Sequence, residues 1–197
     1  MSTYCNIYVK TKRAGERVLE NVTNYIEGKM KLKVNKAKSA VDYPRQRKFL
    51  GFTIGKMYGK TMVIINKKSI DRVKDKIRVI TNRNKSMSME ARLYKLKELT
   101  VGWVNYFKIA SAKKQMETLD EWTRRRLRAC IWKQWKKIKT RHANLVKLGV
   151  DRNKAWEYAN TRKGYWRISN SPILATTLTN KYFENMGYCS FSSCYFK

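Results

Sequence analysis

From about Ser69 onward, the apolar residues of this chain recur at the spacing of an α-helix. The clearest stripe lies between about Met89 and Ala110 and consists of Leu93, Leu96, Leu99, Trp103, Tyr106, Phe107 and Ala110. Such a stripe is stable when a neighbouring element covers it. An earlier helix through Ile70–Ile80 and a later one from about Met116 to Lys139 can provide that cover, so the pattern predicts a small helical bundle.

The first third of the chain has a different pattern, which mixes strands with one helix. Cys5, Ile7 and Val9 alternate with polar or amphipathic residues, which predicts a half-buried strand. A helix is expected from about Ala14 to Met30. The runs KFLGFTIG and KTMVIIN predict a hairpin with Gly59 near its turn. The predicted fold class is therefore α+β, with a boundary near residue 67 where the period changes.

The end of the chain is also predicted to fold. The sequence is 43% hydrophobic and 12% aromatic, which is unlike a disordered basic tail. Ser171 suits a helix N-cap and Pro172 the first helical position, while Gly187 suits the C-terminal end of the same helix.

The strongest functional indication is charge. The chain has 45 Lys and Arg residues against 14 Asp and Glu residues, a net charge of +31. Cations crowded on a compact body repel one another, and a polyanion relieves that repulsion while its own counterions are released. An anionic membrane is the alternative, but no apolar run approaches the ~20 residues that a spanning helix needs. The N-terminal MSTYCNIYVK also lacks the apolar core of a signal peptide. We therefore expect a nucleic acid as the partner and no membrane.

No metal or cofactor is expected. Zinc sites need close pairs of Cys or His ligands at suitable spacing, and Cys5, Cys130, Cys189, Cys194 and His142 do not supply them. The pattern favours reduced thiols in a reducing compartment.

No acidic residue occurs between Glu121 and Asp151. A helix over this stretch would have a narrow apolar face formed by Leu127, Ile131, Trp135 and Ile138. Apart from Arg124, the basic residues would cover the remaining surface. The cations of this helix that we expect to bind RNA are Arg124, Arg125, Arg126, Arg128, Lys133, Lys136 and Lys137.

Trp132 lies among these cations and away from the apolar face. It either packs against a neighbouring part of the protein or forms a platform on which an unpaired base stacks. Trp135, in contrast, is predicted to be a core residue.

A second group of basic and aromatic residues surrounds Gly164 and consists of Arg162, Lys163, Tyr165, Trp166 and Arg167. Arginine and aromatic side chains suit RNA, whose specific recognition uses splayed bases and backbone contacts. Glycine would let the backbone approach a ligand closely. The alternative is a buried aromatic turn with charges on its surface.

Three stretches resemble the reverse transcriptase/maturase proteins encoded by group II introns. They are FLGFTI (Phe49–Ile54), WTRRRLRACIWKQWKKIKTR (Trp122–Arg141) and ANTRKGYWRISNSPIL (Ala159–Leu174). The third is the most specific, and the resemblance covers essentially the whole chain.

The resemblance implies three domains and a set of partners. Residues 1–66 would be a partial reverse-transcriptase palm, 67–140 a helical thumb/maturase domain, and 141–197 a C-terminal nucleic-acid-binding region. Leu50 and Gly51 would lie at the primer grip. The partner would be group II intron RNA, with a DNA target or an RNA/DNA hybrid as further partners, in a bacterial cytoplasm.

The sequence departs from this family at the polymerase active site. The family has Tyr-Ala-Asp-Asp before the stretch that here reads CNIYVKTKRAGERV, and its aspartates hold Mg²⁺. By this resemblance, Thr3 and Tyr4 would stand in their places, and the chain would lack the fingers and the front of the palm. Mg²⁺ would be needed only by a complete polymerase. We therefore expect the chain alone to bind intron RNA and assist splicing. The alternatives are the thumb half of a split RNA-directed DNA polymerase, paired with a separate fingers–palm chain, or a non-functional remnant of a mobile intron.

Overall fold

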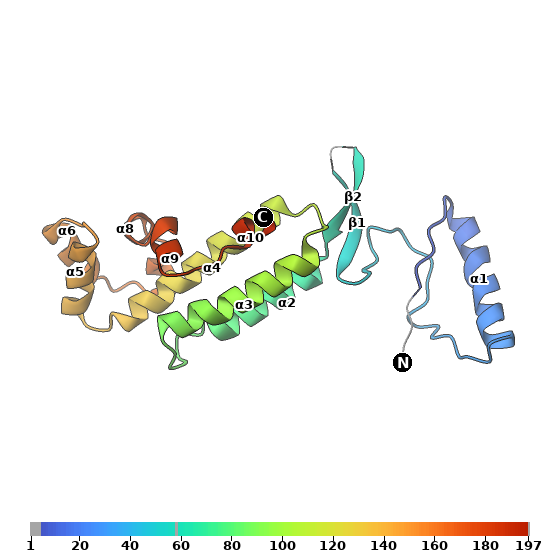
Figure 1. Ribbon diagram of the computed structural model, residues 1–197, viewed down its shortest axis with the longest axis horizontal. Coiled ribbons are helices and arrows are strands. Elements are labelled where there is room, and N and C mark those ends of the chain that lie inside the picture. The colour runs from blue at the N-terminus through green and yellow to red at the C-terminus, as the bar shows by residue number, and fades with distance from the viewer. Residues whose placement is uncertain (1–4, 58, 197) are drawn as a thin grey trace. The chain divides into compact units, whose positions relative to one another are not determined.

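The computed structural model describes residues 5–57 and 59–196, and the chain divides into two compact units, residues 1–69 and 70–197. The described part is mostly helical and contains one two-stranded sheet (Figure 1). This confirms the predicted α+β class. Thr3 and Tyr4, which the sequence resemblance places at the positions of the family's aspartates, lie outside the described residues.

The first unit contains α1 (Lys12–Gly28), close to the helix predicted from residue 14. The helix begins at Thr11, whose hydroxyl oxygen accepts a hydrogen bond of 3.2 Å from the backbone N–H of Ala14. Gly15 is buried on this helix, where an added Cβ would lie 2.7 Å from a methyl carbon of Val41. Glycine therefore allows α1 to pack closely against the later loop.

The predicted strand at residues 5–9 is wrong. These residues have no regular secondary structure, and Ile7 is 53% exposed. A strand needs a neighbouring strand to pair its backbone groups. In the described part of the chain, the sheet consists of two other strands, so the alternating pattern has no partner.

The predicted hairpin is confirmed. Strands β1 (Phe52–Met57) and β2 (Lys60–Ile65) are antiparallel, with Phe52 opposite Ile65 and Met57 opposite Lys60. Gly59 in the turn has φ +75°, a conformation that favours glycine.

The second unit is built on three long helices that run alongside one another: α2 (Lys67–Ile80), α3 (Met89–Phe107) and α4 (Lys113–Gln134) (Figure 1). Their facing sides form the core, whose fully buried side chains include Ile77, Leu96, Val104, Met116, Leu119 and Leu127. The predicted bundle is thus confirmed. Tyr106 is a correction to the predicted stripe, because its side chain is exposed while the neighbouring Phe107 turns inward.

The predicted helix from Met116 to Lys139 is interrupted. The chain leaves the helix at Trp135, where ψ is 58°, and α5 (Ile138–Lys147) starts in a new direction. Arg141 Nε donates a 3.0 Å hydrogen bond to the Trp135 carbonyl, which stabilises the break. Ile138 is consequently 43% exposed and Trp135 only half-buried, so the predicted apolar face ends at Ile131.

Five short helices follow α5: α6 (Arg152–Ala159), α7 (Tyr165–Ile168), α8 (Pro172–Thr177), α9 (Asn180–Asn185) and α10 (Phe191–Tyr195). Helices α5 and α6 pack together beyond the end of α4 (Figure 1). Helix α7 packs on α4. Helix α10 contacts both α3 and α4.

The single helix predicted between Ser171 and Gly187 is two helices. Pro172 does occupy the first helical turn, but the Ser171 hydroxyl makes no capping bond. The first helix stops at Leu178, where ψ is 68°, and the Thr179 hydroxyl oxygen caps the second. Gly187, with φ +90°, ends that second helix as predicted.

Asp120 holds the C-terminal segment against α4. Its buried carboxylate accepts hydrogen bonds from the Tyr188 hydroxyl at 2.9 Å, the Phe191 N–H at 2.8 Å and the Ser192 N–H at 2.9 Å. Burial raises the pKa of Tyr188 well above its usual value, and the Asp120 charge raises it further. One acidic side chain therefore fixes a segment about seventy residues away in sequence.

Candidate nucleic-acid interface

The second unit carries most of its positive charge without acidic partners. Among its described residues, 70–196, the structure shows a single ion pair, between Arg78 and Asp75. The Asp120 carboxylate accepts hydrogen bonds from the backbone of the C-terminal segment and pairs with no cation among these residues. The cations of this unit thus keep their capacity to bind an external anion.

Arg125 and Trp166 bring the two predicted basic clusters together. The Arg125 guanidinium carbon lies 4.0 Å from the centre of the Trp166 ring, and Nη2 donates a 3.2 Å hydrogen bond to the Trp166 carbonyl. Trp166 remains 38% exposed. The residues of 162–167 therefore lie against the arginine-rich part of α4, forming one surface from segments about forty residues apart.

The other members of the 162–167 cluster differ in exposure. Arg162, Lys163 and Arg167 are exposed, whereas Tyr165 is half-buried with Arg83 over its ring at 5.4 Å. An added Cβ on Gly164 would meet no atom within 4 Å, so packing within the protein does not require glycine there.

Three of the predicted RNA-binding arginines of α4 also hold the protein together. Arg126 Nε donates to the Thr81 hydroxyl oxygen at 2.6 Å, and Arg128 Nε donates to the Leu178 carbonyl at 3.1 Å. Arg125 contacts Trp166 as described. Burial lowers the pKa of Arg128, and the neighbouring charge of Arg124 lowers it further. These guanidinium groups are fixed in place rather than freely mobile.

The lysines near the end of α4 differ in accessibility, because Lys133 is half-buried. Lys133 Nζ donates to the Asn84 side-chain oxygen at 2.6 Å. Lys136 and Lys137 are exposed in the break between α4 and α5. The ammonium groups of Lys136 and Lys137 are therefore open to solvent.

Trp132 does not form an exposed stacking platform. Its side chain is 1% exposed, and the Arg141 guanidinium covers its ring at 4.9 Å. Packing within the protein was the other interpretation of this residue. Trp132 is part of the core because α4 is enclosed on several sides near its C-terminal end, where Ala129, Cys130 and Ile131 are also buried.

Sequence reasoning missed a group of residues that joins α2 to α4. Trp122 of α4 is surrounded by Lys74 and Arg78 of α2 and by Arg126 of its own helix. Lys74 and Arg78 are four residues apart, so they share one face of α2. Their spacing was visible in the sequence, but the position of Trp122 opposite them was not.

Leu50 and Gly51, the residues assigned to the primer grip by resemblance, precede β1. Both have positive φ angles, 48° and 86°. The Gly51 carbonyl accepts hydrogen bonds from the Asn66 N–H at 2.9 Å and the Ser69 hydroxyl at 3.0 Å. The local backbone is therefore tied to the start of α2, and the role at a primer stays a prediction.

In the described part of the chain, no helix combines the length and the apolar character needed to cross a membrane. No three His, Cys, Asp or Glu side chains are grouped there as a metal ion would require.

Comparison with known families finds a similarity for the first part of the second unit. Residues 70–149 match the family model described as the group II intron, maturase-specific domain. No curated protein matches the chain. The matched range includes most of α2 and all of α3, α4 and α5, and so covers the bundle with its arginine-rich face. Residues 70–149 are therefore similar to the maturase-specific domain of group II intron proteins, in agreement with the resemblance seen in the sequence.

Proposed function

We propose that the second unit binds structured group II intron RNA and assists the splicing of that intron. The family match supports a maturase role. The observation that carries the proposal is the surface where Arg125 stacks on the half-exposed Trp166 beside the exposed Arg162, Lys163 and Arg167. We call this group the α4–α7 surface.

The α4–α7 surface offers the two kinds of contact that folded RNA needs. Its cations bind phosphates without reading sequence. Trp166 offers an indole ring on which an unpaired base can stack, and the Arg125 guanidinium holds that ring in position. A paired RNA helix presents no free base to such a platform, because its bases are already stacked. The surface should therefore prefer RNA with loops over plain duplex.

The test is a binding titration of the full chain with two labelled RNAs at one salt concentration: a group II intron domain with exposed loops and a fully paired duplex. Trp166→Ala should weaken binding to the looped RNA by ~1–3 kcal/mol, because one stacked base is lost. Binding to the duplex should change little. Trp166→Phe keeps an aromatic face and should retain most of the affinity.

A matched control is Trp156→Ala. Trp156 is 43% exposed, similar to Trp166, but it lies on α6 and stacks on His142 at 4.2 Å. Each variant must melt within a few degrees of the parent. Equal loss of looped-RNA affinity from both tryptophan variants, or no loss from Trp166→Ala, would contradict the assignment of the α4–α7 surface.

A competing RNA/DNA hybrid of the same length distinguishes splicing assistance from the handling of a primer and template. We expect the intron RNA to remain bound when the hybrid is added in equal amount. Displacement by the hybrid would favour the polymerase-half interpretation instead.

A further inference from the structure

The α2–α4 junction contains three cations around one tryptophan ring. Lys74 Nζ lies 5.9 Å from the centre of the Trp122 ring, the Arg78 guanidinium carbon 5.4 Å and the Arg126 guanidinium carbon 5.1 Å. Lys74 and Trp122 are half-buried and Arg78 is exposed, so the group opens to solvent at the α2 side. We call these four residues the Trp122 cluster.

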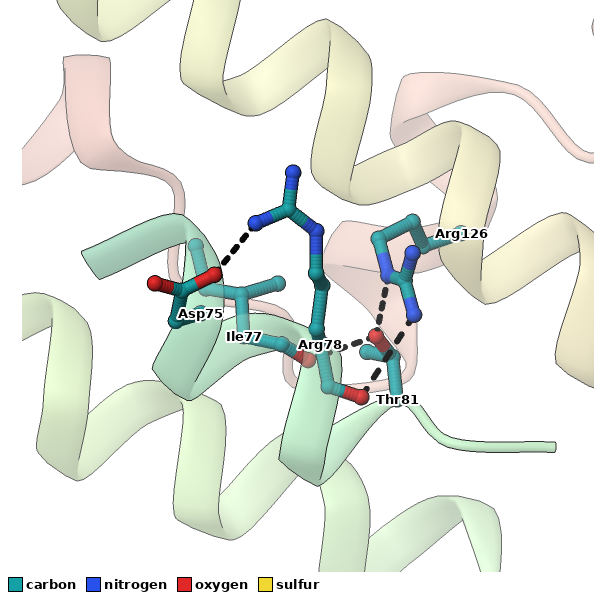
Figure 2. Close-up of polar contacts among 5 residues, drawn as sticks. All are labelled: Asp75, Ile77, Arg78, Thr81 and Arg126. Atoms are coloured by element: carbon teal, nitrogen blue, oxygen red, sulfur yellow. Dashed lines mark hydrogen bonds and ion pairs between the residues drawn. The ribbon is translucent and has the colours of Figure 1, made fainter. Parts of the chain in front are cut away.

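Arg126 is held in a fixed orientation within the Trp122 cluster. Its Nε donates to the Thr81 hydroxyl oxygen at 2.6 Å, and its Nη2 donates to the Arg78 carbonyl at 3.4 Å. The Thr81 hydroxyl in turn donates to the Ile77 carbonyl at 2.6 Å, so it is itself fixed. Figure 2 shows the Arg126 guanidinium reaching from α4 to Thr81 and the Arg78 carbonyl at the end of α2, while the Arg78 guanidinium points toward Asp75.

The charges of the Trp122 cluster are only partly balanced within the protein, because one carboxylate faces three cations. Asp75 pairs with Arg78, and among residues 70–196 no other ion pair is present. Burial lowers the pKa of Arg126, and the positive charges of Arg78 and Arg83 lower it further. Like charges held this close destabilise one another unless an anion lies between them.

The geometry suits a tetrahedral oxyanion. Each guanidinium has five N–H donors. Arg126 uses Nε and Nη2 in internal hydrogen bonds, and Arg78 uses Nη1 to bind Asp75, so donors remain on both arginines. Fixed guanidinium groups bind phosphate oxygens in pairs, and Lys74 adds a point charge. The Trp122 ring forms an apolar wall that limits the hydration of the cations beside it.

We propose that the Trp122 cluster is a phosphate-binding site that takes a backbone phosphodiester of the bound RNA. This inference rests on the proposed function, because the RNA is the source of the phosphate. It adds α2 to the nucleic-acid interface and makes Thr81 a positioning residue that acts through Arg126.

The first test is Arg78→Gln in the full chain, with Lys76→Gln as the matched control. Arg78 is exposed, and its backbone carbonyl still accepts from Arg126 after the substitution. Lys76 is exposed on the same helix, two residues from both Lys74 and Arg78, and therefore on the opposite face. Affinity for the labelled intron domain should fall about tenfold in Arg78→Gln and about twofold or less in Lys76→Gln. The slope of log affinity against log salt should decrease by about one unit in Arg78→Gln.

The second test removes the support of Arg126 without removing a charge. Thr81→Val keeps the shape of the side chain but loses the hydroxyl, whereas Thr81→Ser retains it. Affinity should fall about threefold to tenfold in Thr81→Val and return in Thr81→Ser, measured below the melting range of both variants.

The results separate this inference from the proposed function. If the parent chain does not bind the intron domain, the proposed function is wrong. If the parent binds and Arg78→Gln behaves like Lys76→Gln in both affinity and salt slope, the phosphate site is overturned while the RNA-binding function stands. Loss of affinity in both Thr81→Val and Thr81→Ser would overturn the positioning role.

Discussion

Trp132 and Trp166 each carry an arginine over the indole ring, yet they lie in opposite environments. Trp132 is 1% exposed beneath Arg141, and Trp166 is 38% exposed beside Arg125. Both residues occur among cations in the sequence, so composition alone does not separate them. The difference shows that an arginine–tryptophan pair can join two helices in the core or present an aromatic face to solvent. Exposure, rather than the pair itself, determines which role is available.

The arginines above the two rings differ in the same way. Arg141 bonds to the Trp135 carbonyl at 3.0 Å and to the Ala159 carbonyl at 3.4 Å, so it joins α4, α5 and the end of α6. Arg125 bonds to the carbonyl of the tryptophan that it covers. The first arginine therefore supports the fold around the helix break, and the second positions a surface residue.

The largest expected effect is that of Trp132→Ala on stability. Removal of a fully buried tryptophan should cost ~3–5 kcal/mol in the free energy of unfolding, because it removes buried apolar area and leaves a cavity. Chemical denaturation of parent and variant measures the difference. A variant that stays as stable as the parent but loses affinity for looped RNA would show that Trp132 is a base platform after all.

Arg141→Ala and Arg125→Ala test the same comparison and should have intermediate effects on the free energy of unfolding. Arg141→Ala should lower the free energy of unfolding by ~1–3 kcal/mol, because two backbone carbonyls lose a charged donor. Arg125→Ala should cost ~1 kcal/mol and should weaken binding to looped RNA as well. The comparison breaks down if Arg125→Ala proves the more destabilising of the two in the same denaturation experiment.

The smallest expected effect on stability is that of Lys136→Gln combined with Lys137→Gln. Both lysines are exposed in the helix break, so the free energy of unfolding should change by ~0.5 kcal/mol or less. If both contact phosphates, the salt slope of RNA binding should decrease by about two units. An unchanged slope would place the phosphate contacts on the arginine-rich part of α4 instead.

The sequence predicted those helices and turns whose formation depends on residues close together in the chain. The apolar stripe between Leu93 and Phe107 predicted α3, and Gly59 predicted the hairpin turn. The helix break at Trp135 was not predicted, because no proline or glycine marks it and it is held by Arg141 from the next helix. The apolar residues keep their helical spacing across the break, but Ile138 no longer lies on the same helix face as Ile131.

Interactions between distant segments account for the rest. Asp120 binds residues 188–192, and Arg126 binds Thr81, from 45 residues away. The residues around each partner contain no pattern that indicates which distant residue it will contact. For the same reason the contributions of Lys74 and Arg78 were missed, although the charge of the surface as a whole was visible from composition.

The salt dependence of RNA binding by the unmodified chain tests the central claim most directly. The dissociation constant for the labelled intron domain would be measured at several salt concentrations between about 50 and 200 mM. If the cations of the second unit neutralise ~6–10 phosphates, affinity should fall by a factor of ~10³–10⁵ on paired RNA over this range, and somewhat less on single strands. A dissociation constant that stays nearly constant across the range would contradict the account, because the positive charge would then not form the binding surface.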